Sequence, residues 1–531
     1  MPFYILCLLA VSGVLAQVQT SFTQTIGERW TGYGRDAQHT GLSPTAAQAL
    51  NNIHWSTPVD LGTVASGPLL VHYGSPVITQ NNIVLVPVRT GTAPEFEILA
   101  FNGATGASLF TLTTDYVLPA HDWVPPYGPA LSVSVEGWGA VRRVTGRAQV
   151  VARTLPLKER IYYPGAGGTV YYRDDLDTST GPSGQIAFYG NSLYAANKQV
   201  FNGAVQISTP IVADDTGNIY FGFTVTQANP ANLLSGIARI GEDGTGAWVS
   251  AQAVAGGDLS IAGVALNCTP ALSNDGLTLY VAVSNGDEFG TGYLVSVNSQ
   301  TLAPIAHTAL LDPRGGPATV SSDSSASPTV GPDGDVYFGV LEGNCCTSHN
   351  DRGWMLHFNA GLTQTKVPGS FGWDASASVV PAKLVPSYTG TSSYLILTKY
   401  NNYVDTGTGD GVNKVAVLDP GASMADPVAG AAVQVMKEVI TIAGQTPDPS
   451  AGFPNAVREW CINTAAVDSV TGSAIVNSED GVVYRWNFAT NSLTQRKVLT
   501  AGRGESYTPT AIGVDGTVYA INDGILFAIG N

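Results

Sequence analysis

Residues 326–340 read "ASPTVGPDGDVYFGV", and the same arrangement of residues returns along the chain. It consists of a Ser or Thr, a Pro, a few apolar residues, a turn around Asp-Gly and a strand rich in β-branched residues and Tyr. Clear copies begin at Ser208 ("STPIVADDTGNIYFGF"), Cys268 ("CTPALSNDGLTLYVAV") and Tyr507 ("YTPTAIGVDGTVYAI"). We call each copy a station. A recurring motif of this kind predicts a fold built from repeated supersecondary units.

The spacing of the stations supports a regular repeat. The prolines at 210, 270 and 328 are 60 and 58 residues apart. Weaker stations begin at Gly74, Ala377 and Asn463. The interval from Pro76 to Pro210 is 134 residues, so we expect one degenerate station between them, around "ERIYYPGAGGTVYYRD" (159–174). Eight stations result.

Each station predicts a β-hairpin, because alternating or apolar strand-like runs flank Gly, Asp and Asn. A third strand such as "YLVSVN" (293–298) and a fourth such as "APIAHTAL" (303–310) follow it. Units of four strands without a helical period predict an all-β chain, an eight-bladed β-propeller of four-stranded antiparallel blades. Seven blades are the alternative, since the second station is poor. The last unit has three strands before residue 531, so we expect an N-terminal strand to complete it.

The N-terminal residues 1–16, "MPFYILCLLAVSGVLA", predict a cleaved secretory signal, followed by a single β-propeller domain over 17–531. We therefore expect a secreted, extracellular protein in which disulfides are permitted. The net charge is −16 and 12% of residues are charged. This acidic balance excludes nucleic acid and anionic membranes as partners, and no later apolar run predicts membrane insertion. We expect a monomer.

One face of the ring should carry the function. If each inner strand begins at one face, here called the top face, then the loop after each second strand lies there too. Four of these loops are long: "TVTQANPANLLSG", "SNGDEFGTG", "EGNCCTSHNDRG" and "KYNNYVDTGTGDGVN". The four mature cysteines, at 268, 345, 346 and 461, map to the same face. Long loops on a rigid scaffold favour ligand binding, so we expect a small molecule, glycan or peptide there.

Two segments resemble pyrroloquinoline-quinone-type (PQQ-type, quinoprotein-like) propellers. They are "WTGYGRDAQHTGLSP" from Trp30 and "ILAFNGATGASLFTL" from Ile98, in which Phe110 stands where the family has a docking Trp. The superfamily includes quinoprotein dehydrogenases and non-catalytic propellers such as the outer-membrane assembly lipoprotein. For an enzyme, the resemblance implies PQQ and calcium as cofactors.

The resemblance also implies a bond between the adjacent cysteines Cys345 and Cys346, since quinoprotein alcohol dehydrogenases place such a ring against their cofactor. The alternative pairing links Cys268 to one of these neighbours across adjacent blades and Cys461 to the other. Unpaired thiols or a simple loop staple remain open.

Polar and aromatic residues near the top face are candidate ligand contacts. His349 and Asp351 flank the cysteine pair and suit acid–base chemistry or a metal. Two further segments, "HDW" (His121 to Trp123) and "REW" (Arg458 to Trp460), join charge to an aromatic ring. Such pairs stack on a sugar or quinone, and packing between blades explains them equally well.

The glycine-rich loop after the sixth station offers oxygen atoms. It begins with Asn401 and Asn402, and Asp405, Asp410 and Asn413 follow. Calcium prefers six to eight hard oxygen ligands on flexible backbone, so these last three residues are weak calcium candidates beside a solvated turn.

Three hypotheses result, in decreasing order of support. The first is a secreted binding or scaffold propeller. The second is a PQQ- and calcium-dependent oxidoreductase of alcohols or sugars. The third is a polysaccharide lyase or glycosidase. The glycine run "GAGG" (165–168) is no phosphate loop, because no Lys follows it, and no serine-hydrolase or zinc-protease motif occurs.

Overall fold

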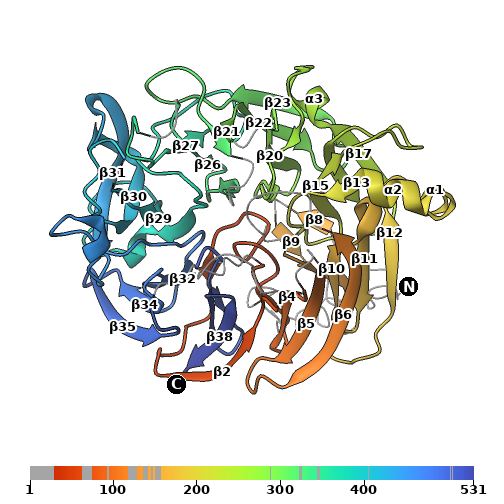
Figure 1. Cartoon of the computed structure of the whole chain (residues 1–531), viewed down its shortest axis with the longest axis horizontal. Coiled ribbons are helices and arrows are strands. Elements are labelled where there is room, and N and C mark those ends of the chain that lie inside the picture. The colour runs from red at the N-terminus through yellow and green to blue at the C-terminus, as the bar shows by residue number, and fades with distance from the viewer. Residues whose placement is uncertain are drawn as a thin grey trace, which may run out of the picture.

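The computed structural model describes residues 29–61, 74–91, 95–117, 128–135, 142–144, 147–149, 157–286, 289–321, 326–343, 347–404, 406–502, 504 and 506–531. They form eight small antiparallel sheets arranged as a ring (Figure 1). The predicted eight-bladed β-propeller is confirmed, and the seven-bladed alternative is wrong. The predicted signal peptide lies outside the described residues.

We number the blades in chain order and give each from the axis outward. Blade 1 contains β3 (Val77–Ile78), β4 (Ile83–Arg89), β5 (Glu95–Asn102) and β6 (Ser108–Val117). Blade 2 contains β7 (Ala130–Val135), β10 (Leu157–Pro164), β11 (Thr169–Asp174) and β12 (Ser183–Ala187). Blade 3 contains β13 (Val205–Ile207), β14 (Val212–Ala213), β15 (Ile219–Val225), β16 (Gly236–Ile240) and β17 (Gly246–Ser250). Blade 4 contains β18 (Gly263–Val264), β19 (Ala271–Leu272), β20 (Thr278–Ser284), β22 (Gly292–Asn298) and β23 (Pro304–Ala309).

The second half of the ring follows the same plan. Blade 5 contains β25 (Thr329–Val330), β26 (Val336–Val340) and β27 (Trp354–Phe358). Blade 6 contains β28 (Ser378–Pro381), β29 (Tyr394–Tyr400), β30 (Lys414–Asp426) and β31 (Gly430–Ala443). Blade 7 contains β32 (Ala466–Asp468), β33 (Ser473–Asn477), β34 (Val482–Asn487) and β35 (Ser492–Val498), and blade 8 contains β36 (Ala511–Ile512), β37 (Val518–Asn522) and β38 (Ile525–Gly530).

The remaining elements lie between or beside the blades. They are β1 (Leu42–Ser43), β2 (Asn52–Pro58), the pairs β8 (Arg142–Val144) with β9 (Arg147–Gln149) and β21 (Phe289–Gly290) with β24 (Val320–Ser321), and the short helices α1 (Asn191–Ala196), α2 (Lys198–Ala204), α3 (Ala251–Val254), η1 (Ala166–Gly168), η2 (Ala382–Leu384) and η3 (Pro449–Ala451). None of the helices in the described ranges has the length and hydropathy needed to cross a membrane.

The stations form the inner edge of the blades, as predicted. The prolines at 210, 270 and 328 come just before β14, β19 and β25. Blade 2 differs from the expectation. Its inner strand is β7, and residues 159–174 supply parts of β10 and β11 instead. An inserted hairpin, β8–β9, separates β7 from β10 and hides the station in the sequence.

The Asp-Gly pairs make the tight turn between the inner and second strands. In blade 5, Gly334 has a φ of +90°, and the carboxylate of Asp333 accepts the backbone N–H of Asp335 at 3.1 Å. Asp515 and Gly516 of blade 8 repeat this geometry, with a φ of +86° at the glycine. The turn needs a residue with positive φ, which glycine adopts easily, and the Asp before it accepts a backbone N–H of the same turn. These two requirements explain why Asp-Gly recurs at this place.

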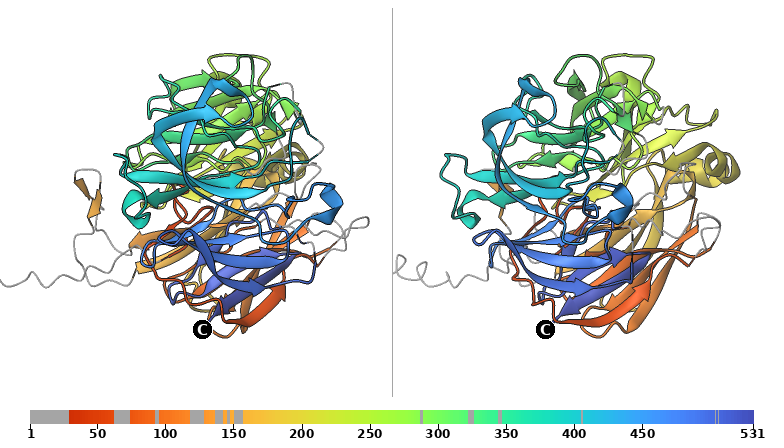
Figure 2. Two further views of the ribbon diagram at one scale, coloured as in Figure 1. Left: turned by 90° about the vertical axis from the view of Figure 1, so that its left-hand side faces the viewer. Right: turned by 60° about the vertical axis from the view of Figure 1, so that its left-hand side comes forward.

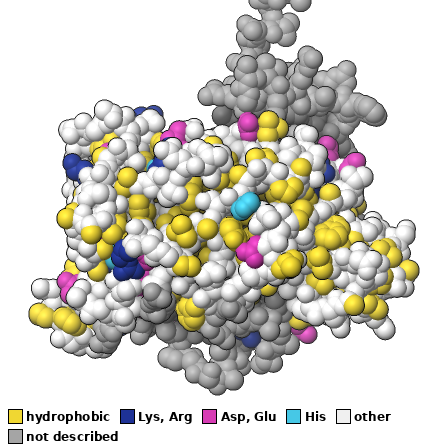
Figure 3. Space-filling view, turned by 90° about the horizontal axis from the view of Figure 1, so that it is seen from above, with side chains coloured by type: hydrophobic (Ala, Val, Ile, Leu, Met, Phe, Trp, Pro, Cys, Tyr) yellow, Lys and Arg dark blue, Asp and Glu magenta, His cyan; other side chains and the backbone are white. Residues whose placement is uncertain are grey.

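Burial falls from the middle strands to the rim. The strand β4 (IVLVPVR) is buried at every position except its last, because both faces of the blade pack against neighbouring blades. The outer strand β2 instead alternates exposed and half-buried residues. The side of the ring that carries β23 and α3 shows isolated charged side chains among uncharged polar and hydrophobic ones (Figure 3).

The two ends of the chain close the ring together. β2 pairs antiparallel with β38, so a strand from the N-terminal segment completes blade 8 as predicted. β1 adds to blade 7, pairing parallel with β32. Trp55 of β2 donates its indole N–H to the Gly103 carbonyl of blade 1 at 2.8 Å, which joins blade 8 to blade 1.

The segment 30–43, here called the channel segment, crosses the centre of the ring (Figure 1). Its backbone contacts the inner strands of blades 1, 2, 4, 5, 6 and 7, through Trp30, Thr31, Ala37, Gln38, Thr40 and Gly41. Gly41 has a φ of +62°, and a Cβ there would lie 2.7 Å from the Ala465 carbonyl oxygen. The segment that resembles the PQQ-type propellers therefore fills the axis of this ring.

His39 anchors the channel segment from inside. Its imidazole is fully buried, its Nδ1–H donates to the Pro328 carbonyl at 2.7 Å, and it meets Tyr33 edge-on with ring centroids 5.2 Å apart. Burial lowers the pKa of His39 to about 4. The side chain is thus neutral at pH 7, which suits a position without a counter-charge in contact.

A belt of side chains joins four successive blades around Tyr33. Ser327 Oγ accepts the Thr269 N–H (2.9 Å), Ser376 Oγ accepts the Ser327 N–H (2.8 Å), and Asn463 Oδ1 accepts the Ser376 N–H (3.1 Å). The Tyr33 hydroxyl donates to Asn463 Oδ1 at 2.5 Å and contacts Ser376 Oγ at 2.9 Å. The polar residue at the start of a station is therefore the acceptor that links its blade to the one before.

Blade 5 has an incomplete outer edge that blade 6 covers. Residues 364–369 run beside β27 with isolated bridges in place of a regular fourth strand. The long hairpin β30–β31 extends over this edge (Figure 2). Val433 and Val435 of the hairpin join the hydrophobic cluster that contains Phe338 and Trp354. The hairpin reaches the top-face loop of blade 5 through Asp426.

The belt predicts the effect of removing one hydroxyl. Ser376→Ala deprives the buried Ser327 N–H of its acceptor and should lower the free energy of unfolding by about 2 kcal/mol. Ser260→Ala, which removes a surface hydroxyl bonded to Asp258, should change it by no more than about 0.5 kcal/mol. Equilibrium urea unfolding followed by tryptophan fluorescence measures both variants. Equal midpoints for Ser376→Ala and the parent protein would show that the belt does not hold the blades.

Candidate functional site

The top-face loop of blade 5 is wound around one buried carboxylate. Glu342 accepts three backbone N–H groups, from His349 (3.0 Å), Asp351 (3.1 Å) and Gly353 (2.9 Å). Its side chain is fully buried. Three charge-assisted hydrogen bonds to one side chain fix the path of residues 347–353.

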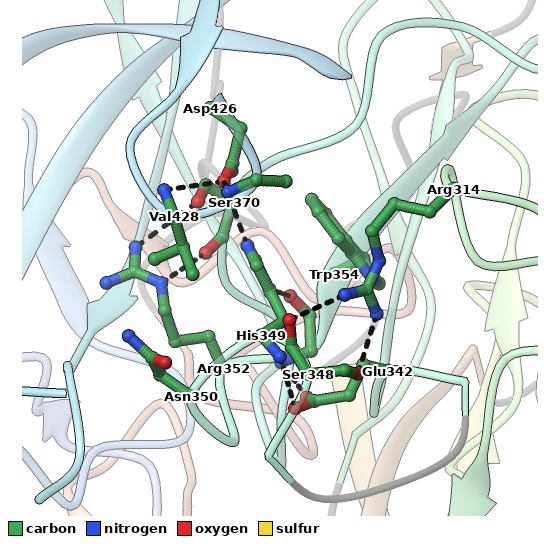
Figure 4. A network of polar contacts seen from close by, with 12 residues as sticks. Arg314, Glu342, Ser348, His349, Asn350, Arg352, Trp354, Ser370, Asp426 and Val428 are labelled. Atoms are coloured by element: carbon green, nitrogen blue, oxygen red, sulfur yellow. Dashed lines mark hydrogen bonds and ion pairs between the residues drawn. The ribbon is translucent and has the colours of Figure 1, made fainter. Parts of the chain in front are cut away.

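His349 is held on three sides within this loop (Figure 4). Its ring stacks on Trp354 with centroids 3.8 Å apart and an interplanar angle of 11°. Nδ1 lies 3.1 Å from the Gly353 carbonyl oxygen, and Nε2 lies 3.1 Å from Asp426 Oδ1. Both ring nitrogens therefore lie within hydrogen-bond distance of an oxygen atom. The His349 side chain is fully buried and does not face the solvent as a ligand contact.

The Asp426 carboxylate is kept ionised by its contact with His349. Burial alone would raise the pKa of Asp426, but the hydrogen bond and charge of His349, with smaller contributions from the Ser370 hydroxyl and the Ala429 N–H, lower it to about 2. The pair joins the blade 5 loop to the β30–β31 hairpin. A buried pair of this kind fixes geometry more reliably than it adds stability.

Two arginines complete the network in Figure 4. Arg314 grips Asp312 through Nε (3.0 Å) and Nη2 (2.7 Å) and donates to the Ser348 carbonyl at 2.6 Å. Arg352 donates to the carbonyls of Ser370 (2.9 Å) and Asn401 (3.0 Å). We call residues 342–343 and 347–353 with their partners on blades 4 and 6 the loop platform. The side chains of Arg314, Glu342, His349 and Arg352 hold the loops in place.

The blade 6 loop is fixed to the loop platform by amides. Asn350 Nδ2 donates to Asn402 Oδ1 at 2.9 Å, and Asn402 Nδ2 donates to Asp410 Oδ1 at 2.7 Å. Asn413 Oδ1 accepts the Asn402 N–H at 2.9 Å, and Asn413 Nδ2 donates to the Val457 carbonyl.

These contacts bear on the calcium hypothesis. Asp410 Oδ1 also accepts the Val412 N–H, so the candidate oxygen atoms of Asp410 and Asn413 bind the loop itself. Asp405 lies outside the described residues. Calcium requires several oxygens converging on one point, so the calcium site at Asp405, Asp410 and Asn413 stays a prediction.

Asn401 and Trp460 pack beneath the loops. Asn401 is fully buried and exchanges hydrogen bonds with the Trp460 backbone, through Oδ1 (3.3 Å) and Nδ2 (3.2 Å). The Trp460 ring is fully buried edge-on against Tyr484. Arg458 pairs with Asp448 at 3.2 Å. Trp460 of the segment "REW" therefore packs between blades 6 and 7, which is one of the two interpretations that the sequence allowed.

A cluster of donors that the sequence analysis missed lies at the mouth of the ring. Single donor atoms of Glu459, Cys461 and Glu479 all lie within 4.8 Å of one another. Tyr403 is close to them, and burial, followed by the charge of Glu459, raises its pKa well above the usual value, so its phenol is neutral. Glu459 and Cys461 are two residues apart, so an extended chain places both side chains on the same face, and this spacing indicates a shared site. Glu479 comes from the loop after β33 and only the fold brings it there.

The chemistry of this cluster does not match calcium. A thiolate with two carboxylates suits a borderline divalent ion such as zinc, whereas calcium takes oxygen ligands only. Below the cluster, the buried pair Lys399 and Asp374 lies 3.9 Å apart. The cluster of Glu459, Cys461 and Glu479 therefore differs from an all-oxygen calcium site.

The cysteine predictions have a mixed outcome. Cys268 and Cys461 both precede inner strands, β19 and β32, and so lie toward the top face. No disulfide occurs among the described residues, and the Cys268 thiol accepts the Ala282 N–H. The proposed bond from Cys268 to a neighbour of the next blade is wrong, because that side chain faces the core, where burial raises its pKa to about 12. Cys345, Cys346, His121 and Trp123 lie outside the described residues.

Sequence comparison finds no match among protein-family models or curated proteins. Structural comparison finds a europium-containing methanol dehydrogenase with a TM-score of 0.53 and 10% identity, over 93% of this chain and 89% of that chain. A quinohemoprotein alcohol dehydrogenase from Comamonas testosteroni aligns with a TM-score of 0.49 and 10% identity, over 95% and 81% of the two chains. At these identities the likeness concerns the fold. The chain shares the β-propeller fold of the europium-containing methanol dehydrogenase.

Asp351 of the loop platform yields a pH prediction. Burial, and then the charge of Glu342, raise its pKa to about 6 in the folded protein, above about 3.9 in the unfolded chain. Ionisation of Asp351 therefore disfavours the fold as the pH rises through 6. Asp351→Asn should increase the urea midpoint at pH 8, and the difference should vanish below pH 4. Asn accepts the φ of +57° at this position.

A lower midpoint for Asp351→Asn than for the parent protein at pH 8 would contradict this assignment. Asp243→Asn is the control, because Asp243 is fully exposed and its pKa is lowered by Thr245. That variant should gain no stability at pH 8.

Proposed function

We propose that this protein is a secreted binding propeller. Its loops over blades 5 and 6 recognise a small molecule, glycan or peptide on the top face without converting it. Secretion rests on the predicted signal at residues 1–16, and we expect the protein to act as a monomer.

One observation carries the proposal: two residues suited to acid–base catalysis, His349 and Glu342, are consumed in fixing the loops. A general acid or base must reach the proton it transfers. His349 is instead fully buried between Trp354 and Asp426, and Glu342 is saturated by backbone N–H groups. Loops held in one conformation lose little entropy on binding, which favours recognition.

The second candidate is a PQQ-dependent oxidoreductase of alcohols or sugars. It is favoured by the fold, which is similar to that of a europium-containing methanol dehydrogenase, and by the acidic groups Glu459 and Glu479 at the mouth. Bound PQQ would supply the electron-accepting chemistry. The thiol of Cys461 beside these carboxylates distinguishes the cluster from an all-oxygen calcium site, which favours the binding proposal. A lyase or glycosidase stays a prediction from the sequence.

A cofactor titration separates the two candidates. We expect the purified mature chain, mixed with calcium and PQQ under oxidising conditions, to show no stoichiometric PQQ uptake by absorbance. It should also fail to reduce an artificial electron-acceptor dye with alcohols or sugars. Stoichiometric uptake together with dye reduction would overturn the binding proposal in favour of the enzyme.

Recognition by the loop platform is tested with immobilised glycans and displayed random peptides. Asp426→Ala removes the partner of His349 and should loosen the blade 5 loop, so bound probes should be released at least about 5-fold faster. Asp243→Ala, on an exposed turn of blade 3, is the matched control. Retention of every bound probe by Asp426→Ala would show that the loop platform is not the binding surface.

A further inference from the structure

A cavity lies on the top face, where blades 1, 2 and 3 meet. Its volume is about 120 Å³, and its walls include Asp115, Tyr116, Gly167, Asn202, Val205 and Gln206. These residues come from the end of β6, from η1, from α2 and from β13. In Figure 1, α2 and β11 lie on the opposite side of the ring from β30 and β31, so this cavity is separate from the loop platform.

The glycine run "GAGG" builds one wall of the cavity. Gly167 has a φ of +69°, and a Cβ there would lie 2.8 Å from Asn202 Oδ1 and 2.9 Å from the Tyr194 ring. The Ala166 N–H donates to Asp115 Oδ1 at 2.9 Å. Glycine is thus required for the η1 turn to approach α2 this closely. The GAGG run, which is no phosphate loop, therefore shapes the wall of this cavity.

Tyrosine hydroxyls hold three of the cavity walls. Tyr171 donates to Asp115 Oδ1 (3.1 Å), Tyr189 donates to the Gly167 carbonyl (2.6 Å), and Tyr194 donates to Asn202 Oδ1 (3.1 Å). Two of these rings are themselves stacked, Tyr171 on Tyr163 with centroids 5.5 Å apart and Tyr189 on Phe201 at 4.2 Å. The polar groups of the cavity are therefore positioned before any ligand arrives.

The charge of the cavity favours a neutral ligand. Asp115 Oδ2 lies 3.6 Å from the Lys198 ammonium group, which balances its charge, and both side chains are partly exposed. A cation would compete with Lys198 for the carboxylate, and an anion would face Asp115. The remaining polar groups are uncharged amides and backbone.

Two side-chain amides in the wall of the cavity have donor or acceptor atoms that bind no other described residue. The half-buried Gln206 amide makes no side-chain hydrogen bond to another described residue, and Asn202 uses only its oxygen, for Tyr194. Amide groups offer a donor and an acceptor side by side, which matches adjacent hydroxyl groups of a sugar. Apolar walls from Val117 and Val205 suit the C–H edge of a sugar ring.

We propose that this cavity binds a neutral, hydroxyl-rich ligand no larger than one sugar ring, either a free monosaccharide or the terminal sugar of a glycan. The small volume of the cavity, about 120 Å³, limits the ligand to a single ring. Gln206 and Asn202 donate to ring hydroxyls, and Asp115 accepts from one.

Binding of defined sugars tests the proposal. The probes are the methyl glycosides of glucose, galactose, mannose and N-acetylglucosamine, measured by saturation-transfer NMR and calorimetry, and the corresponding immobilised oligosaccharides. We expect saturable binding of at least one probe. Gln206→Ala and Asn202→Ala should each weaken it about 5-fold, the loss of one hydrogen bond. Gln434→Ala, which removes an exposed amide on β31, should leave it within about 2-fold.

Each outcome has a fixed interpretation. Binding of free glycosides supports a monosaccharide ligand, and binding of immobilised oligosaccharides alone supports a glycan end. Binding that Gln206→Ala and Asn202→Ala leave unchanged, or no saturable binding of any probe, overturns the proposal. Asp426→Ala serves as a cross-check, because a sugar held at the loop platform would respond to that variant and not to Gln206→Ala. The thermal midpoint of each variant confirms folding.

Discussion

The ring depends on hydrogen bonds that cross from one blade to the next near its axis. Neighbouring inner strands belong to separate sheets, so no backbone ladder connects them. From blade 4 to blade 7, the belt of Ser327, Ser376 and Asn463 supplies that connection, because each of these side chains accepts a backbone N–H of the preceding blade. Tyr33 fills the space inside the belt and bonds to two of its members. Because each contact is fully buried, the loss of an acceptor is costly and the register of adjacent blades is well defined.

The same constraint explains why the top face has a fixed shape. Because the register between blades is fixed, the top-face loops of neighbouring blades also lie at fixed positions relative to one another. On blades 5 and 6 this scaffold supports the network of Glu342, His349 and Asp426, and on blades 1 to 3 it supports the cavity beside η1 and α2. Both places present polar atoms held by buried partners. A rigid face of this kind suits recognition of a ligand with a matching shape, without rearrangement of the protein.

The fold was predictable because its determinants are local. The Asp-Gly turns and the station prolines are read directly from the sequence, and the incomplete last unit announced the closing strand β2. Blade 2 escaped because the β8–β9 insertion separates its inner strand from the rest. The position of the channel segment on the ring axis could not be predicted, because its partners are backbone groups of six blades. No residue pattern in 30–43 identifies those partners. The site was harder still: His349 looks like a catalytic residue until Trp354 and Asp426, five and 77 residues away, are placed around it.

The pairing of β2 with β38 has a consequence for how the molecule is made. During synthesis the first strands of the ring emerge long before their partners, since Asn52 pairs with Gly530 and Leu42 with Val467. The nascent N-terminal segment must wait, without its native neighbours, until the final residues leave the ribosome. Contacts so distant along the chain slow folding. A truncation at the C-terminus would therefore leave both an open seam and an unoccupied N-terminal strand, a species inclined to pair with other chains.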